Sequence, residues 1–171
     1  MISFTVPGVP APGGSKKAFM NPRTNKIVVM DDAKNNKGWR ERVAIFASQA
    51  MAGRPPLEGA LRIYVVFSVV RPKGHYGTGR NAGCLKDWAK SAHPIGRPDT
   101  TKLFRALEDA LTGIVWKDDA QVVSQLVIKT YTDNGPSAYI AVEPKLVFEE
   151  IDQCLSFHDL KARKSASALT S

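Results

Sequence analysis

The sequence predicts an α/β or α+β fold in which a single mixed β-sheet is covered by two helices. Short segments that alternate apolar and polar residues, or that are apolar throughout, indicate five strands. Two longer segments repeat apolar residues every three or four positions, as helices do. The predicted order is β-β-α-β-α-β-β, which is too irregular for a doubly wound sheet.

The N-terminal half is expected to hold three of the strands and one helix. Strands are predicted at residues 2–6, where Ile2, Phe4 and Val6 alternate with polar residues, and at 26–30. Between them, a loop rich in Pro and Gly delivers Lys16 and Lys17. A helix is predicted over residues 32–51, with Asp32 as a possible cap, from the spacing of Trp39, Val43, Phe46, Ala47 and Ala50. The strand at 61–70 is apolar on both faces, which favours a central position.

The C-terminal half begins with a long loop at residues 71–96 that contains five glycines. A helix is predicted from Asp99 to Leu111, with Phe104, Leu107 and Leu111 as its apolar stripe. Strands follow at 121–132 and 137–147. We therefore expect one domain over residues 1–150 and a polar, frayed tail over 151–171.

Charge is the clearest compositional signal. The chain has a net charge of +8 and a pI near 9.6. Residues 71–105 carry eight basic and two acidic side chains, and residues 15–42 carry eight and three. Two such clusters indicate a DNA-binding groove, although a solvated basic surface would have the same composition.

Cysteine content and apolar runs indicate the compartment. Cys84 and Cys154 form no pairing motif, so we expect no disulfide framework and a reducing environment. The N-terminus lacks the pattern of a signal peptide, and the longest apolar run, from Ile63 to Val70, is too short to span a bilayer. The sequence thus predicts a cytoplasmic protein.

Two carboxylate sites are candidates for chemistry. Asp99 stands at the start of the second helix, and Asp118 and Asp119 are adjacent before the next strand. A helix N-cap and a turn would explain them structurally. However, two carboxylates about 5 Å apart repel each other by about 3 kcal/mol at an effective dielectric near 20, and a bound cation relieves this cost. Carboxylates are ligands for Mg²⁺ and Mn²⁺, which assist phosphodiester hydrolysis, so a metal site and a turn both remain open.

Strand parity assigns Asp119 to the polar face of its strand, opposite an apolar face formed by Val122, Leu126 and Ile128. Asp109 is excluded as a ligand shared with Asp99, because ten helical residues separate them by roughly 15 Å. A surface ion pair with Arg105 is the better interpretation of Asp109.

Lys102 and Arg105 continue a polar stripe from Asp99, where cations could hold phosphate oxygens or simply be solvated. The three histidines have no metal-ligand spacing with the cysteines, which argues against zinc. No phosphate-binding P-loop is present.

Three segments carry a recognisable pattern. One runs Arg97-Pro-Asp-Thr-Thr-Lys-Leu-Phe-Arg-Ala-Leu-Glu-Asp-Ala-Leu-Thr-Gly113, and the second runs Val115-Trp-Lys-Asp-Asp-Ala-Gln-Val-Val123. The third is Val6-Pro-Gly-Val-Pro-Ala-Pro-Gly-Gly-Ser-Lys-Lys17. Together they resemble the RusA family of Holliday-junction resolvases, whose signature is approximately (K/R)-P-D-x-D-N/K-L-x-K/R-x-x-x-D-A-L followed by D-D-x-Q-V-V. The resemblance spans roughly residues 2–145.

This resemblance implies a homodimer that cleaves four-way DNA junctions by paired nicks with Mg²⁺ or Mn²⁺, in recombination and repair, often in a phage or prophage. It implies catalytic roles for Asp99, Asp118, Asp119 and Arg105, which takes the place of a functional lysine. The three aspartates would hold the metal. Lys16, Lys17, Lys102 and Lys129 are our candidate DNA contacts.

One position departs from the signature: Thr101 stands where the family has a second helix aspartate. A hydroxyl group brings no negative charge to a metal site. The alternative to an active nuclease is therefore a junction-binding protein with weakened catalysis. A general basic nucleic-acid-binding domain would explain the charge, but not the acidic pair.

Overall fold

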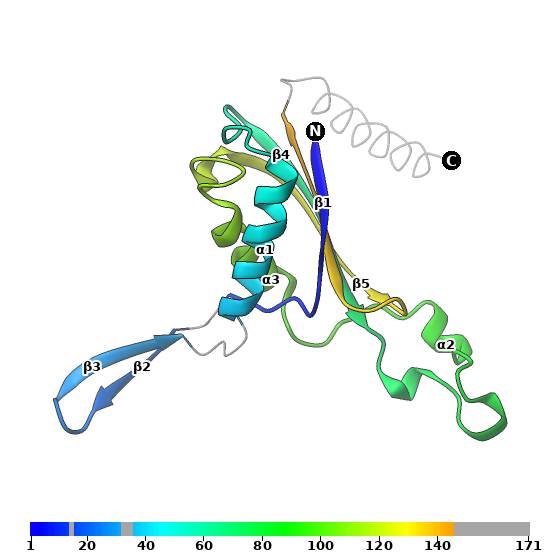
Figure 1. Ribbon diagram of the computed structural model, residues 1–171. Coiled ribbons are helices and arrows are strands. Elements are labelled where there is room, and N and C mark those ends of the chain that lie inside the picture. Colours follow the sequence, from blue (N-terminus) through cyan, green and yellow to red (C-terminus); the bar gives the residue numbers. More distant parts are fainter. Residues whose placement is uncertain (14–15, 32–35, 146–171) are drawn as a thin grey trace, which may run out of the picture.

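A computed structural model describes residues 1–13, 16–31 and 36–145, and for residues 16–19 and 29–31 it describes the backbone alone. Its main element is a four-stranded sheet in the order β1-β6-β4-β5 (Figure 1). These strands span Ile2–Pro7 (β1), Leu61–Val70 (β4), Val122–Thr132 (β5) and Ser137–Pro144 (β6). β4 pairs parallel to β5 and antiparallel to β6, and β6 pairs antiparallel to β1. The predicted mixed sheet and the central position of the 61–70 strand are confirmed.

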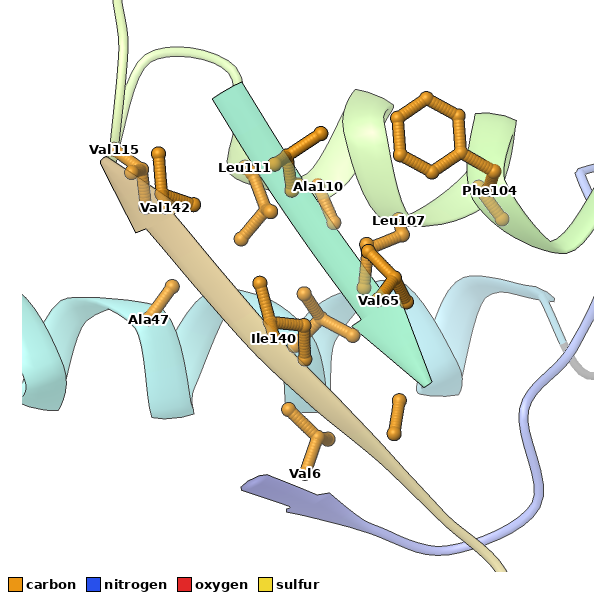
Figure 2. Packing of buried hydrophobic residues seen from close by; sticks show 14 of the residues in the cluster. Val6, Ala47, Val65, Phe104, Leu107, Ala110, Leu111, Val115, Ile140 and Val142 are labelled. Atoms are coloured by element: carbon orange, nitrogen blue, oxygen red, sulfur yellow. The ribbon is translucent and has the colours of Figure 1, made fainter. Parts of the chain in front are cut away.

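Two helices cover one face of this sheet, as predicted: α1 at Asn36–Met51 and α3 at Thr100–Leu111. Figure 2 shows Leu107 and Leu111 of α3 directed towards Val65 of β4 and Ile140 of β6. The helical stripes read from the sequence are the buried ones, because each helix turns its apolar side to the sheet. The fully or nearly fully buried residues of the two helices include Trp39, Val43, Ala47, Leu103, Phe104, Ala106, Leu107 and Leu111.

The prediction about the faces of β5 was wrong. Val127 packs against the core, while Leu126 and Ile128 are about half exposed on the uncovered face of the sheet. The register explains the reversal, because Val127 lies beside buried Val65, whereas Leu126 lies beside Tyr64. Apolar residues on both faces of β5 therefore do not identify the covered face.

A second, two-stranded sheet was not predicted. β2 (Lys16–Asn21) and β3 (Lys26–Asp31) form an antiparallel hairpin that projects from the body of the molecule (Figure 1). Lys16 and Lys17 therefore open a strand, where a loop was expected. Just before the hairpin, the Gly13 amide donates to the Lys102 carbonyl oxygen at 2.7 Å. A Cβ atom on Gly13 would come within 3.2 Å of the Ala106 nitrogen, so glycine permits this close approach to α3.

The 71–96 loop contains more structure than was predicted. It includes two single-turn 3₁₀ segments, at Lys73–His75 and Gly79–Asn81, and the short helix α2 at Asp87–Lys90. Within the described ranges, no helix has the length and apolar character needed to cross a membrane. The predicted cap Asp32, Cys154 and the 151–171 tail lie outside the described residues.

The position of Leu107 beneath α3 predicts a contrast with Leu126 on the uncovered face. Leu107→Ala should destabilise the fold by about 2–5 kcal/mol, since it leaves a cavity at a fully buried site. Leu126→Ala, at a side chain 51% exposed, should cost less than about 1 kcal/mol. Urea denaturation of both variants measures the difference, and equal losses would contradict the assigned faces.

Candidate active site

Asp99 occupies the N-cap position of α3, as expected, but its carboxylate accepts no capping hydrogen bond from the helix backbone. It lies 3.7 Å from the ammonium nitrogen of Lys102 instead, and both side chains are more than half exposed. A simple capping role therefore does not account for this carboxylate. Thr101, two residues further on, is exposed in the first turn of the same helix.

Lys129 of β5 holds the segment that leads to Asp99. Its ammonium group donates to the carbonyl oxygens of Gly96 at 2.7 Å and Pro98 at 2.9 Å. These are charge-assisted hydrogen bonds, which stabilise more than neutral ones do. Two of its three donors thus serve the Gly96–Pro98 turn, a role that the sequence did not suggest for this candidate DNA contact.

The double-aspartate element is a 3₁₀ turn, Asp119–Gln121, with Asp118 as its N-cap. The Asp118 carboxylate accepts a hydrogen bond from the Ala120 amide at 2.8 Å. The strand begins only at Val122, so the parity argument that placed Asp119 on a strand face does not apply. Both aspartates are exposed.

Gln121 fixes this turn to its surroundings through four hydrogen bonds. Its side-chain oxygen accepts from the amides of Lys117 and Asp118, at 2.9 and 3.1 Å. Its side-chain nitrogen donates to the carbonyl oxygens of Leu57 and Gly59, at 3.0 and 3.1 Å. This bonding accounts for a glutamine two residues after the acidic pair, because only an amide both donates and accepts in this way.

The two carboxylate sites lie at opposite ends of α3. Asp119 acts electrostatically on Glu108, in the last turns of the helix, whereas Asp99 precedes the first turn. Nine helical residues separate Asp99 from Glu108, which corresponds to about 14 Å along the axis. The structure thus does not bring Asp99 and Asp119 of one chain to a common metal ion. Among the described residues, no three His, Cys, Asp or Glu side chains are grouped closely enough to hold one.

Glu108 is the acidic neighbour that sequence analysis missed. Its half burial, followed by the charges of Asp119 and Asp109, raises the pKa of its carboxyl group above the ordinary value. The signal was present in the sequence, because Glu108 continues the stripe of Asp99, Lys102 and Arg105 at intervals of three residues. Arg105 is exposed on this stripe and partly offsets the rise.

Asp109 faces α1 and not Arg105. Its carboxylate lies 3.9 Å from an Arg40 guanidinium nitrogen, and another nitrogen of Arg40 donates to its backbone oxygen. The predicted surface ion pair exists, but with a different partner. Arg40, Asp109 and Thr112 line a surface depression together with Lys117, Asp118 and Asp119.

The segment that leads to the hairpin contacts α3 near its Asp99 end. Gly13 contacts α3 at Lys102, and Lys16 follows three residues later, a chain reach of about 10 Å at most. The β2–β3 hairpin therefore starts near the N-terminal half of α3. Lys102 and the start of the hairpin lie on the same side of the molecule as Asp99.

Comparison with known families gives a direct assignment. Residues 7–143 match the family model described as endodeoxyribonuclease RusA. This span contains β4, β5, β6 except its last residue, both helices and both carboxylate sites, but only the last residue of β1. The chain therefore belongs to the RusA family of endodeoxyribonucleases.

A relative in Bacillus subtilis (strain 168) carries the description uncharacterized protein YqaN. It is 31% identical over 134 residues, which is 77% of this chain and 89% of the relative. The similarity thus extends across nearly the whole of that protein.

The two hydrogen bonds of Lys129 predict that its substitution lowers the free energy of unfolding more than substitution of Lys102 does. Lys129→Met should destabilise the protein by about 1.5–3 kcal/mol, because two hydrogen bonds from a charged donor are lost. Lys102→Met, at an exposed side chain, should change stability by less than about 0.5 kcal/mol. Thermal denaturation tests this. A different outcome would identify Lys129 as a phosphate contact instead. In that case Lys129→Met would unfold like the wild type, and the log–log slope of its DNA affinity against salt would fall by about 0.9.

The raised pKa of Glu108 predicts a pH-dependent gain in stability. The pKa of Glu108 is higher in the folded state than in the unfolded state, so ionisation of Glu108 costs stability, and this cost grows as pH rises above the unfolded-state pKa. Glu108→Gln should therefore raise Tm at pH 7 in EDTA, and the gain should vanish below about pH 4.

Glu58→Gln is the matched control, because the pKa of Glu58 is shifted in the opposite direction. A hydrogen bond from Lys117 lowers the pKa of Glu58, so its ionised form contributes stability above that pKa. This variant should not gain stability at pH 7. An equal gain in both variants would show that the gain does not come from the local environment of Glu108.

Proposed function

We propose that this protein is a Mg²⁺- or Mn²⁺-dependent endonuclease that resolves four-way DNA junctions by paired nicks, as a homodimer. The observation that carries the proposal is membership of the RusA endodeoxyribonuclease family, together with carboxylates at both ends of an exposed basic stripe on α3. Such an activity would serve DNA recombination and repair, including that of phages or prophages.

The separation of the two carboxylate sites supports the dimer. If Asp99 and Asp119 share a metal ion, they must come from different chains, because about 14 Å of helix separates the two sites in one chain. We infer that Asp99 of one subunit and Asp119 of its partner form each site. Two identical sites related by two-fold symmetry would then cut two strands of a symmetric junction.

The edge strand β5 offers a route to this arrangement. Within the part of the chain that the structure describes, β5 is hydrogen-bonded to β4 on one side only, and an open strand edge is suited to pairing with another chain. The turn Asp119–Gln121 immediately precedes β5, while Lys129, near the other end of β5, holds the turn before Asp99. A two-fold axis near the middle of β5 would thus place Asp119 of one subunit beside Asp99 of the other.

The residues present fit a divalent cation. Mg²⁺ is usually held by one or two protein carboxylates and keeps positions for water and substrate phosphate. When bound, it supplies charge neutralisation and activation of a water molecule. Asp99 and Asp119 would hold it, with Asp118 positioned by its cap to orient the turn. Arg105 and Lys102, between the two sites, would bind the phosphate oxygens.

Thr101 favours a second candidate, a junction-binding protein with weak or no cleavage. A hydroxyl group in place of a carboxylate lowers the negative charge available to a cation. Incubation of a labelled synthetic four-way junction with Mg²⁺, with Mn²⁺ and with EDTA separates the two functions. Paired nicks in either metal and none in EDTA support the nuclease, whereas binding without nicks supports the alternative.

Complementation between inactive variants tests the shared site. Asp99→Asn and Asp119→Asn should each abolish nicking alone. After mixing and subunit exchange, a heterodimer would carry one site with both mutations and one intact site. Random assembly then restores about a quarter of the wild-type sites.

The products of this mixture are also informative. One intact site per heterodimer should give single nicks in place of paired cuts. Asp99→Asn mixed with wild type serves as the exchange control. A mixture that exchanges subunits but stays inactive would show that each subunit builds its site alone.

A further inference from the structure

The segment from Arg71 to Pro98, here called the basic lobe, projects from the end of the sheet where β4 and β5 terminate (Figure 1). It carries six lysine and arginine side chains and one acidic residue, Asp87. Asp87 is itself paired with Lys90 at 2.7 Å. The lobe is thus a strongly positive surface suited to a polyanion.

One large aromatic ring stands exposed in this lobe. Trp88 in α2 is 59% exposed, whereas the other two tryptophans, Trp39 and Trp116, are 3% and 0% exposed in the core. Exposing an indole ring to water forfeits the free energy of its burial, so a surface tryptophan among cations suggests a ligand with a flat, apolar face.

The Trp88 ring is held by contacts with other aromatic side chains. The His75 imidazole packs edge-on against Trp88 with ring centroids 4.8 Å apart. On its other side, His75 meets Tyr131 of β5 at 5.1 Å. Trp88 is therefore the last of three aromatic rings in successive edge-to-face contact that begin with Tyr131 in the sheet, and its orientation is set by packing.

The lobe is also fastened to the sheet by polar contacts. The Arg71 guanidinium lies over the Tyr131 ring at 4.9 Å and donates to the Ala89 carbonyl oxygen at 2.6 Å. The Tyr76 hydroxyl donates to the Asp133 carboxylate at the turn after β5. These bonds hold α2, and so Trp88, in a defined position relative to β5.

This position is connected to the proposed active site through β5. The chain leaves α2 at Lys90 and reaches Asp99 nine residues later, through the turn that Lys129 of β5 binds. Tyr131, which supports the aromatic stack, follows Lys129 by two residues on the same strand. Trp88 and Asp99 are thus both anchored to the last third of β5.

We propose that Trp88 is a stacking platform for a nucleobase exposed at the branch point of the DNA substrate. Aromatic rings within positive surfaces bind unpaired bases, because the ring stacks on the base while cations hold the backbone. A fully paired duplex presents no free base face, so this contact would favour branched over linear DNA. The inference rests on the proposed function and names the residue that would give it junction selectivity.

The nature of the surface favours a base over a protein partner. An apolar protein interface needs a contiguous patch, whereas Trp88 is flanked by Lys86, Asp87 and Lys90. Ile95, the other strongly exposed apolar side chain of the lobe, is aliphatic and provides the matched control.

The test compares four proteins: the wild type, Trp88→Ala, Trp88→Phe and Ile95→Ala. Affinity is measured for a synthetic four-way junction and for a duplex of the same sequence, in EDTA at fixed salt. Trp88→Ala should lose about fivefold or more in junction affinity, the lower range for loss of one base–aromatic stack. Its duplex affinity should be unchanged, Trp88→Phe should restore most of the loss, and Ile95→Ala should bind like the wild type.

Tryptophan fluorescence gives an independent readout. Because Trp39 and Trp116 are buried, quenching on junction binding reports on Trp88 and should disappear in Trp88→Phe. Equal losses for junction and duplex, or no quenching by the junction, would overturn the platform. If the wild-type protein binds duplex and junction equally, the proposed junction-selective function is itself wrong. This result distinguishes failure of the proposed function from failure of the Trp88 platform alone.

Discussion

The packing of α3 on the sheet is the constraint on which the site depends. One side of the helix is committed to the core through Leu103, Leu107 and Leu111, which fixes its rotation and its distance from β4. The opposite side must then present the stripe of Asp99, Lys102, Arg105 and Glu108 to solvent. Because the helix is rigid and twelve residues long, it also fixes the separation between the acidic residues at its two ends.

Each acidic end is held by one polar side chain reaching from elsewhere in the fold. Gln121 binds the double-aspartate turn to the 57–59 segment, and Lys129 binds the turn before Asp99 to β5. Both contacts satisfy backbone carbonyl oxygens that secondary structure leaves unpaired. The carboxylates themselves remain exposed, so the fold positions them without consuming their capacity to bind a cation.

Local patterns predicted most of the fold but not the arrangement of its parts. Periodicity located both helices and the four strands of the main sheet, since core packing requires those spacings. It failed at Leu126 and Ile128, because β5 is apolar on both faces and only the register with β4 decides which face is covered. It also failed at Lys16 and Lys17, which open a hairpin whose described side chains, from Met20 to Val28, are exposed or half-buried and so follow no core-facing pattern. The acidic residues of the candidate site could be named from the sequence, but their placement at opposite ends of α3 depends on the tertiary path of the chain.

The distribution of charge suggests how an acidic site can receive a polyanion. Isolated carboxylates would repel a phosphate backbone, yet each aspartate here has a cation nearby: Lys102 lies 3.7 Å from Asp99, and Lys117 and Arg40 line the depression that contains Asp119. The hairpin and the basic lobe extend positive charge on either side of the Asp99 end (Figure 1). Long-range attraction of DNA would therefore come from the hairpin and the basic lobe. The few carboxylates would act only at short range, where they bind a divalent cation. Because the hairpin and the basic lobe carry positive charge away from the carboxylates of α3, substitutions on these projections should change DNA affinity without changing metal affinity.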